Sequence, residues 1–140
     1  MAEVFAGILC GYGLALLYTP LMAIALLRAR TDSPTAARLM PEGTSLVAVS
    51  VVLHTFAFVA FTAIGMVFGM MLDGLESSSP AGGLGSPNHV YTSLALGIVA
   101  IAVLPLAVLS PRLRAPVLSS GLLFAGVFGW LMPYLSLLGG

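Results

Sequence analysis

The chain has 140 residues, of which 59% are hydrophobic and 7% are charged, and its formal net charge is zero. Soluble domains carry charge on about a quarter of their residues, so this composition excludes a soluble protein and indicates an integral membrane protein. All five basic residues are arginines, and they form no basic face, so we exclude nucleic-acid binding.

Four apolar segments are long enough to cross a bilayer, whose hydrocarbon core of about 30 Å needs about 20 helical residues. We predict helices at about residues 4–27, 44–72, 90–110 and 116–138. The predicted fold class is therefore an all-α, four-transmembrane-helix bundle that forms a single membrane domain. Residues 73–89 are rich in Gly, Ser and Pro and lack apolar periodicity, which predicts a flexible outer loop.

The arginines determine the predicted orientation. All of them lie in the first and third loops, whereas the second loop carries only Asp73 and Glu76. Basic loops of multi-pass proteins stay in the cytoplasm. We therefore expect a plasma-membrane protein with both arginine loops cytoplasmic and both termini outside. The arginines are Arg28, Arg30, Arg38, Arg112 and Arg114.

Two proline and arginine patterns suggest an internal repeat. Pro20 precedes the first arginine pair by eight residues, and Pro105 precedes the second pair, Arg112 and Arg114, by seven. This similarity favours two related hairpins in parallel orientation, with chance similarity as the alternative.

Small residues occur at four-residue spacing in every predicted crossing. Such stripes let transmembrane helices approach closely, and van der Waals contact must then drive association because lipid tails are as apolar as leucine. We expect these faces to pack helices within the bundle and against a second copy or another membrane subunit. The alternative is that Gly and Ala are simply common in membrane helices. The predicted packing residues are Gly7, Gly11, Gly65, Gly69, Ser93, Gly97, Gly121, Ala125 and Gly129.

His54 lies near the middle of the second predicted helix and is the candidate site residue. An ionisable side chain inside a membrane costs a few kcal/mol unless it has a partner. Three interpretations stay open. His54 is a structural histidine that donates to a carbonyl freed by Pro20 or Pro105, a contact for haem, chlorophyll or quinone, or part of a transport path.

Several hydroxyl side chains lie at a similar predicted depth. Tyr18, Thr19, Ser50 and Thr55 would line a small polar vestibule, open to the cytoplasm, if they converge with His54 and with Ser119 and Ser120 of the fourth predicted helix. The alternative is that each hydroxyl bonds back to a carbonyl of its own helix. We also predict an aromatic belt at the outer membrane boundary. Its members are Tyr91, Trp130 and Tyr134.

The predicted crossings lack most of the side chains that carry chemistry. They contain no carboxylate, no paired acids, no Ser/His/Asp set, no phosphate loop and no metal-ligand cluster. This pattern disfavours an enzyme, a metal site and an acid-coupled transporter. We expect a non-catalytic membrane subunit that packs into a homo-oligomer or a larger membrane complex. A small channel or transporter for a neutral or weakly charged solute, lined by His54 and Ser/Thr residues, is the second hypothesis. A haem, chlorophyll or quinone site at His54 is the third.

Overall fold

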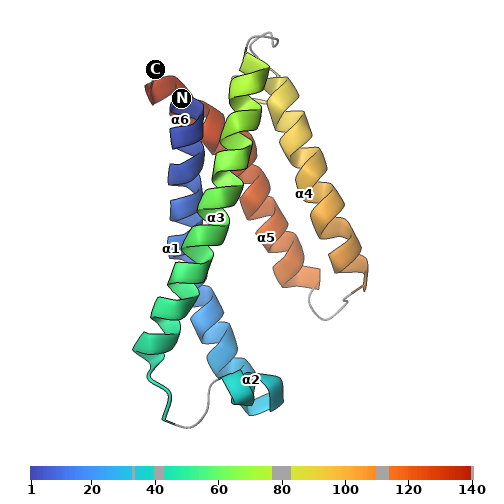
Figure 1. Cartoon of the computed structure of the whole chain (residues 1–140). Coiled ribbons are helices and arrows are strands. Elements are labelled where there is room, and N and C mark those ends of the chain that lie inside the picture. Colours follow the sequence, from blue (N-terminus) through green and yellow to red (C-terminus); the bar gives the residue numbers. More distant parts are fainter. Residues whose placement is uncertain (33, 40–42, 77–82, 110–113, 140) are drawn as a thin grey trace.

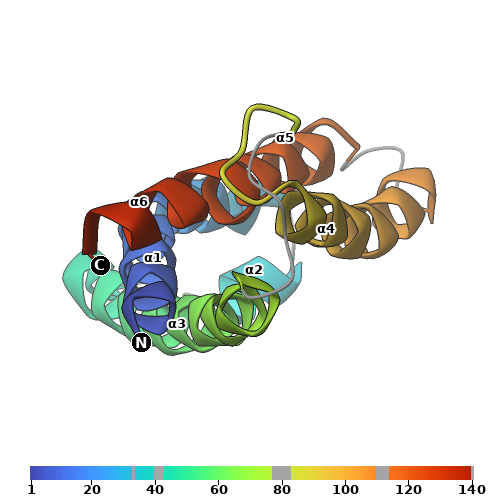
Figure 2. The same ribbon diagram turned by 90° about the horizontal axis from the view of Figure 1, so that it is seen from above.

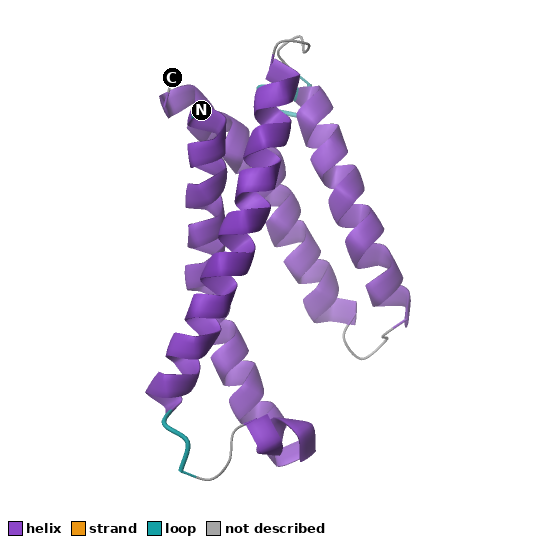
Figure 3. Cartoon of the chain, in the orientation of Figure 1, coloured by secondary structure: helices purple, strands orange, loops and turns teal. Residues whose placement is uncertain are grey.

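The computed structural model is helical throughout apart from its turns (Figure 3). Among the residues that the structure describes, four helices are long and apolar enough to cross a membrane. The predicted all-α architecture, with four helices long and apolar enough to span a membrane, is therefore confirmed for the described residues. The structure describes residues 1–32, 34–39, 43–76, 83–109 and 114–139.

Six of the seven described helical segments build the four membrane-length helices, which are named here the crossings. The first crossing is α1, the second is α3 and the third is α4, while α5, η2 and α6 follow one another without a break and form the fourth. A short helix, α2, follows α1. The bounds are α1 (Ala2–Asp32), α2 (Pro34–Leu39), α3 (Leu46–Glu76), α4 (His89–Leu109), α5 (Arg114–Gly126), the π-helical η2 (Val127–Leu131) and α6 (Met132–Gly139).

The first two crossings extend beyond their predicted ends. The helix predicted to end at residue 27 continues to Asp32, because alanine and arginine favour helix even where the chain leaves the apolar layer. The helix predicted to end at residue 72 continues to Glu76. The first part of the predicted outer loop is therefore helical, and its residues 77–82 lie outside the described part of the chain.

The crossings form two antiparallel hairpins (Figure 1). One consists of α1 and α3, and the other consists of α4 and the α5 to α6 rod. The start of α1 and the end of α6 lie at the same end of the molecule as the turn before α4, while α2 and the start of α5 lie toward the other end. The view along the bundle shows α6 beside α1, so the two hairpins meet at the terminal end (Figure 2). We call that end outer and the opposite end inner.

The α1 and α3 helices are packed backbone against backbone. A Cβ atom on Gly7 would overlap the carbonyl oxygen of Gly65, and a Cβ atom on Gly65 would overlap that of Gly7. A Cβ atom on Gly11 would overlap the carbonyl oxygen of Phe61, and one on Gly69 would lie 2.6 Å from a neighbouring carbonyl oxygen of α1. Only glycine permits this approach, which gives the hairpin continuous van der Waals contact in its outer half.

The second hairpin is packed less tightly. A Cβ atom on Gly121 would lie 2.9 Å from the Val103 side chain, and Ala125 is buried. A Cβ atom on Gly129 would lie 3.8 Å from Thr92, which is ordinary contact. Side chains rather than backbones therefore separate α4 from α5. The two hairpins differ in this respect, and the proposed duplication stays a prediction.

The small residues of α4 lie apart from these contacts. Ser93 and Gly97 are exposed, and a Cβ atom on Gly97 would meet no atom of the described residues within 4 Å. The Ser93 hydroxyl donates to the carbonyl of His89 at 2.8 Å, so its polar group is satisfied within α4. This pair therefore forms a narrow, unpacked strip on the outside of the molecule.

Aromatic rings connect the two hairpins along their inner faces. The ring centroids of Tyr18 and Phe61 lie 5.2 Å apart, and those of Phe61 and Phe124 lie 5.4 Å apart. Phe124 continues to Phe128 at 5.6 Å, and Phe128 stacks on Phe68 at 4.9 Å. These five residues, named here the aromatic ladder, join α1 and α3 to the fourth crossing.

Replacing Gly65 with alanine tests the backbone contact. The methyl group has to displace the carbonyl of Gly7, so Gly65→Ala should lower the free energy of unfolding in detergent micelles by about 2 kcal/mol. The matched control is Gly126→Ala, because a Cβ atom on Gly126 would meet no described atom within 4 Å. The control should be neutral or more stable by up to about 1 kcal/mol. Equal effects of the two changes would contradict this packing.

Candidate functional site

The candidate histidine forms a pair with a threonine across the α1 and α3 contact. Nδ1 of His54 lies 3.0 Å from Oγ1 of Thr19, and the same hydroxyl lies 2.7 Å from the carbonyl oxygen of Ala15. A carbonyl only accepts, so the single hydroxyl hydrogen of Thr19 goes to Ala15. Nδ1 of His54 must then carry a proton and donate to Thr19, and in the neutral ring Nε2 keeps its lone pair.

The observed partner of His54 differs from the one that the structural interpretation of the sequence predicted. That interpretation has His54 donate to a carbonyl freed by a proline, at Leu16 or Ile101. The observed acceptor is instead the hydroxyl of Thr19, the residue that precedes Pro20. A threonine that bonds to its own helix still has a lone pair available, so one hydroxyl satisfies both α1 and His54.

Two aromatic residues flank His54 on the lipid-facing side. The ring of Tyr12 lies 6.5 Å from the His54 ring and 5.7 Å from that of Phe58, both in edge-on geometry. Tyr12 and Phe58 are each 41% exposed. His54 is therefore half-buried in the seam between α1 and α3, beside partly exposed aromatic rings and outside the groove between the hairpins.

The predicted polar vestibule does not assemble around this pair. Thr55 is exposed and donates to the carbonyl of Val51 at 2.9 Å. Tyr18 belongs to the aromatic ladder, and Ser50 is half-buried one turn from His54. Of the five candidate side chains, the structure brings only His54 and Thr19 into hydrogen-bond contact.

The tautomer of His54 is a measurable consequence of the pair. Nitrogen NMR of ¹⁵N-histidine-labelled protein should show His54 protonated at Nδ1, and Thr19→Val should shift the ring away from this tautomer because the acceptor is gone. His54→Phe identifies the signal, since His89 is the only other histidine. A ring protonated at Nε2 in the unmodified protein would contradict the assignment.

A second polar cluster lies buried in the outer half, and sequence reasoning missed it. Pro133 is fully buried and has no N–H, so the carbonyl of Gly129, four residues earlier, lacks its usual donor. The π-helical segment η2 accompanies this break, with the Met132 N–H donating to the carbonyl of Val127. The carbonyls of Phe128 and Gly129 therefore need donors from elsewhere.

Two residues at the start of α4 supply these donors. The Tyr91 hydroxyl donates to the carbonyl of Phe128 at 2.7 Å. The Thr92 hydroxyl lies 2.7 Å from the carbonyl of Gly129 and 3.0 Å from that of Asn88, and we assign its single hydrogen to the nearer acceptor, Gly129. Both side chains are fully buried. The belt position predicted for Tyr91 is thus wrong, because its hydroxyl is drawn inward by an acceptor that Pro133 exposes. A proline inside an apolar segment was the sequence signal for this cluster.

The turn before α4 is ordered by the same cluster. Asn88 caps α4 by accepting from the Tyr91 N–H at 3.0 Å, and the buried Ser86 hydroxyl lies 2.6 Å from that of Thr92. The Trp130 ring N–H donates to the carbonyl of Leu84 at 2.7 Å. The part of the predicted flexible loop at 83–88 is therefore a fixed turn.

The remaining aromatic residue of the predicted belt also holds this turn. The Tyr134 hydroxyl donates to the carbonyl of Gly85 at 2.9 Å. Leu84 has φ 53°, a left-handed backbone that a leucine rarely adopts, and Gly85 follows with φ 68°. Two hydrogen bonds from the fourth crossing thus stabilise a backbone that is unfavourable by itself.

Removing one hydroxyl tests the buried cluster. Thr92→Val leaves the carbonyl of Gly129 without a donor, so the free energy of unfolding in micelles should fall by about 1–2 kcal/mol. Thr55→Val is the matched control, since the Thr55 hydroxyl is exposed and bonds only within its helix. It should change the free energy by less than about 0.5 kcal/mol. A loss in the control as large as that in Thr92→Val would argue against the cluster.

Charged groups close the outer end of the α1 and α3 hairpin. The Met1 amino group lies 2.7 Å from the Glu3 carboxylate and 3.4 Å from that of Asp73. The hydrogen bond to Glu3 raises the pKa of the amino group above its ordinary value. The groups are placed at the edge of the fold and offer no arrangement for catalysis.

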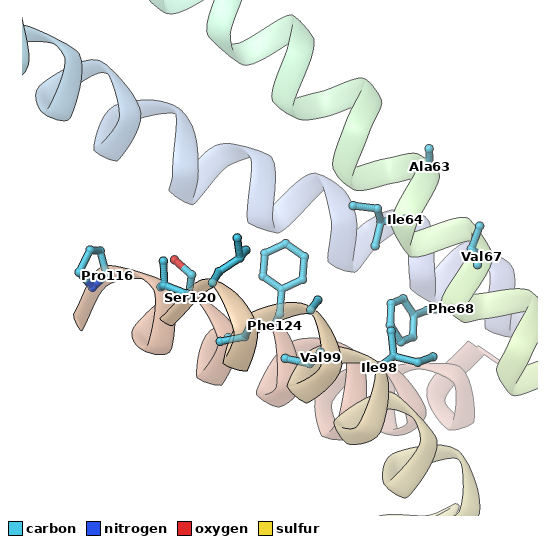
Figure 4. Close-up of a pocket in the computed structure, with 14 residues that line it drawn as sticks. Ala63, Ile64, Val67, Phe68, Ile98, Val99, Pro116, Ser120 and Phe124 are labelled. Atoms are coloured by element: carbon cyan, nitrogen blue, oxygen red, sulfur yellow. The ribbon is translucent and has the colours of Figure 1, made fainter. Parts of the chain in front are cut away.

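A large apolar groove separates the hairpins toward the inner end (Figure 4). Its volume is about 790 Å³, and α3, α4 and α5 each contribute one wall. Phe68 and Phe124 of the aromatic ladder close its outer end, while Leu106 and Pro116 stand at the inner end. Among the described residues that line the groove, Ser120 alone has a polar side chain.

No protein-family model, curated protein or solved structure matches this chain. Among the described residues, no group of three or more His, Cys, Asp or Glu side chains is placed to hold a metal ion. The geometry alone therefore has to support any function.

Proposed function

We propose that this chain is a non-catalytic integral membrane subunit that associates with other membrane helices, first of all those of a second copy. The observation that carries the proposal is the unpacked small-residue strip of α4, formed by Ser93 and Gly97. The equivalent glycines of α1 and α3 are covered by a neighbouring backbone, whereas this pair faces outward. Exposed small residues at four-residue spacing are the usual contact of associating transmembrane helices.

The shape of the α4 face supports a contact centred on Gly97. Farther along the same face, Ile101, Leu104 and Val108 are 77%, 55% and 69% exposed. The face is thus narrow in its outer half and bulky in its inner half. A second helix can approach closely at Gly97 only if it crosses α4 at an angle, which is the geometry of small-residue dimers.

A second copy satisfies this geometry without another component. A two-fold axis beside Gly97 would place the same strip on both sides of the contact, as closed dimers require. A different membrane subunit with a small-residue face would fit the strip equally well and would give the larger complex.

We further propose the orientation that follows from the arginines. Arg28, Arg38 and Arg114 belong to segments near the inner end, and the positive-inside rule then makes that end cytoplasmic and the termini external. The plasma membrane is the proposed location.

The transport hypothesis receives less support from the geometry, whereas the Nε2 lone pair of His54 keeps a cofactor contact as the third alternative. The groove is almost wholly apolar, and His54 lies in a different seam with Thr19 as its partner. A polar path for a solute would need hydroxyl groups that converge, and Thr55 and Ser119 instead bond within their own helices.

Oligomer mass tests the proposal. The purified chain in mild detergent should run as a dimer or higher oligomer by light scattering, and Gly97→Leu should shift it to monomer because the side chain blocks close approach. Gly126→Leu is the matched control, an exposed glycine of the fourth crossing that lies outside the strip, and it should keep the oligomer. A monomeric unmodified protein, or a Gly97→Leu oligomer of unchanged mass, would remove the proposal.

A further inference from the structure

The groove between the hairpins is too large to stay empty. Its volume of about 790 Å³ lies within the range of about 300–1,000 Å³ that is typical of small-ligand sites. An empty apolar space of this size would forfeit the dispersion contacts of all its walls.

The groove is open to the surrounding hydrocarbon. Val67 on its α3 wall and Leu106 on its α4 wall are 65% and 55% exposed although they line it. Figure 4 shows that the labelled side chains of the walls are apolar, with the Ser120 hydroxyl as the exception. A flexible hydrocarbon chain is the occupant that can enter from the side and match such walls.

An arginine lies near the inner end of the groove, outside its lining residues. Arg114 begins α5 two residues before Pro116, and its Nε donates to the carbonyl of Ala107 at 3.2 Å, next to Leu106. The side chain thus bridges α5 and α4 where the groove ends. One of its five N–H groups is used in this bond, and the positive end of the α5 helix dipole lies beside it.

From this juxtaposition we propose that the groove binds one anionic phospholipid, with an acyl chain between the hairpins and the phosphate at Arg114. An apolar groove that ends at a basic side chain is complementary to a lipid with a negative headgroup, and a basic site between transmembrane helices is a known form of lipid recognition. The inference goes beyond the proposed assembly through α4, because the groove and the small-residue strip lie on different faces of α4.

Native mass spectrometry of the delipidated chain with added phosphatidylglycerol or phosphatidylcholine tests this inference. The unmodified protein should retain one phosphatidylglycerol more strongly than phosphatidylcholine. Arg114→Gln should weaken retention of phosphatidylglycerol about fivefold, the effect of one arginine near an anionic lipid, and should leave phosphatidylcholine unchanged. Arg114→Lys keeps the charge and should keep the preference, which separates headgroup binding from a structural role of the bond to Ala107.

The acyl site is tested by filling the groove. Ala102→Phe places a ring among the lining residues and should abolish the retention of both lipids, whereas Leu122→Phe, at a 76% exposed position outside the lining, should not. Equal retention of the two lipids by the unmodified protein would overturn the proposal. Unchanged phosphatidylglycerol binding in Arg114→Gln would overturn it as well. Arg114 is exposed, so this substitution leaves the packing of the core unchanged. Release of lipid when the chain self-associates would show that a second copy occupies the groove instead.

Discussion

The backbone contact between α1 and α3 is the constraint on which the rest of the arrangement depends. Where Gly7 meets Gly65, the two helices are too close for any side chain, so their rotation about each other is fixed. That rotation places Thr19 opposite His54 and turns Phe61 toward the fourth crossing. In lipid no hydrophobic force between helices can replace this contact, because the surrounding chains are equally apolar.

The two hairpins use different means of cohesion, and the groove results from the difference. The first hairpin is joined by its glycines, whereas the second is joined at its outer end by the hydroxyls of Tyr91 and Thr92. The aromatic ladder connects the hairpins, and Phe68 and Phe124 mark where this connection gives way to open space. The described helices therefore leave an apolar groove in the inner half.

The four crossings could be predicted from the sequence because hydropathy over about 20 residues is a local property. The partner of His54 could not, since it depends on which residue of another helix lies opposite. The cluster around Pro133 was harder still, because a π-helical segment and two donors on α4 compensate jointly for one missing N–H. The glycine-rich composition of the outer loop likewise concealed a turn that Trp130 and Tyr134 hold from outside its own sequence.

The bonds from Tyr91 and Thr92 also bear on how the protein reaches its membrane. If the segment 114–139 entered the bilayer alone, the carbonyls of Phe128 and Gly129 would face hydrocarbon without the donors that α4 provides. Each group left unsatisfied would cost several kcal/mol. Partitioning is more favourable when α4 is already beside it and offers its hydroxyls. The third and fourth crossings together are therefore a more favourable unit for partitioning into a bilayer than the fourth alone.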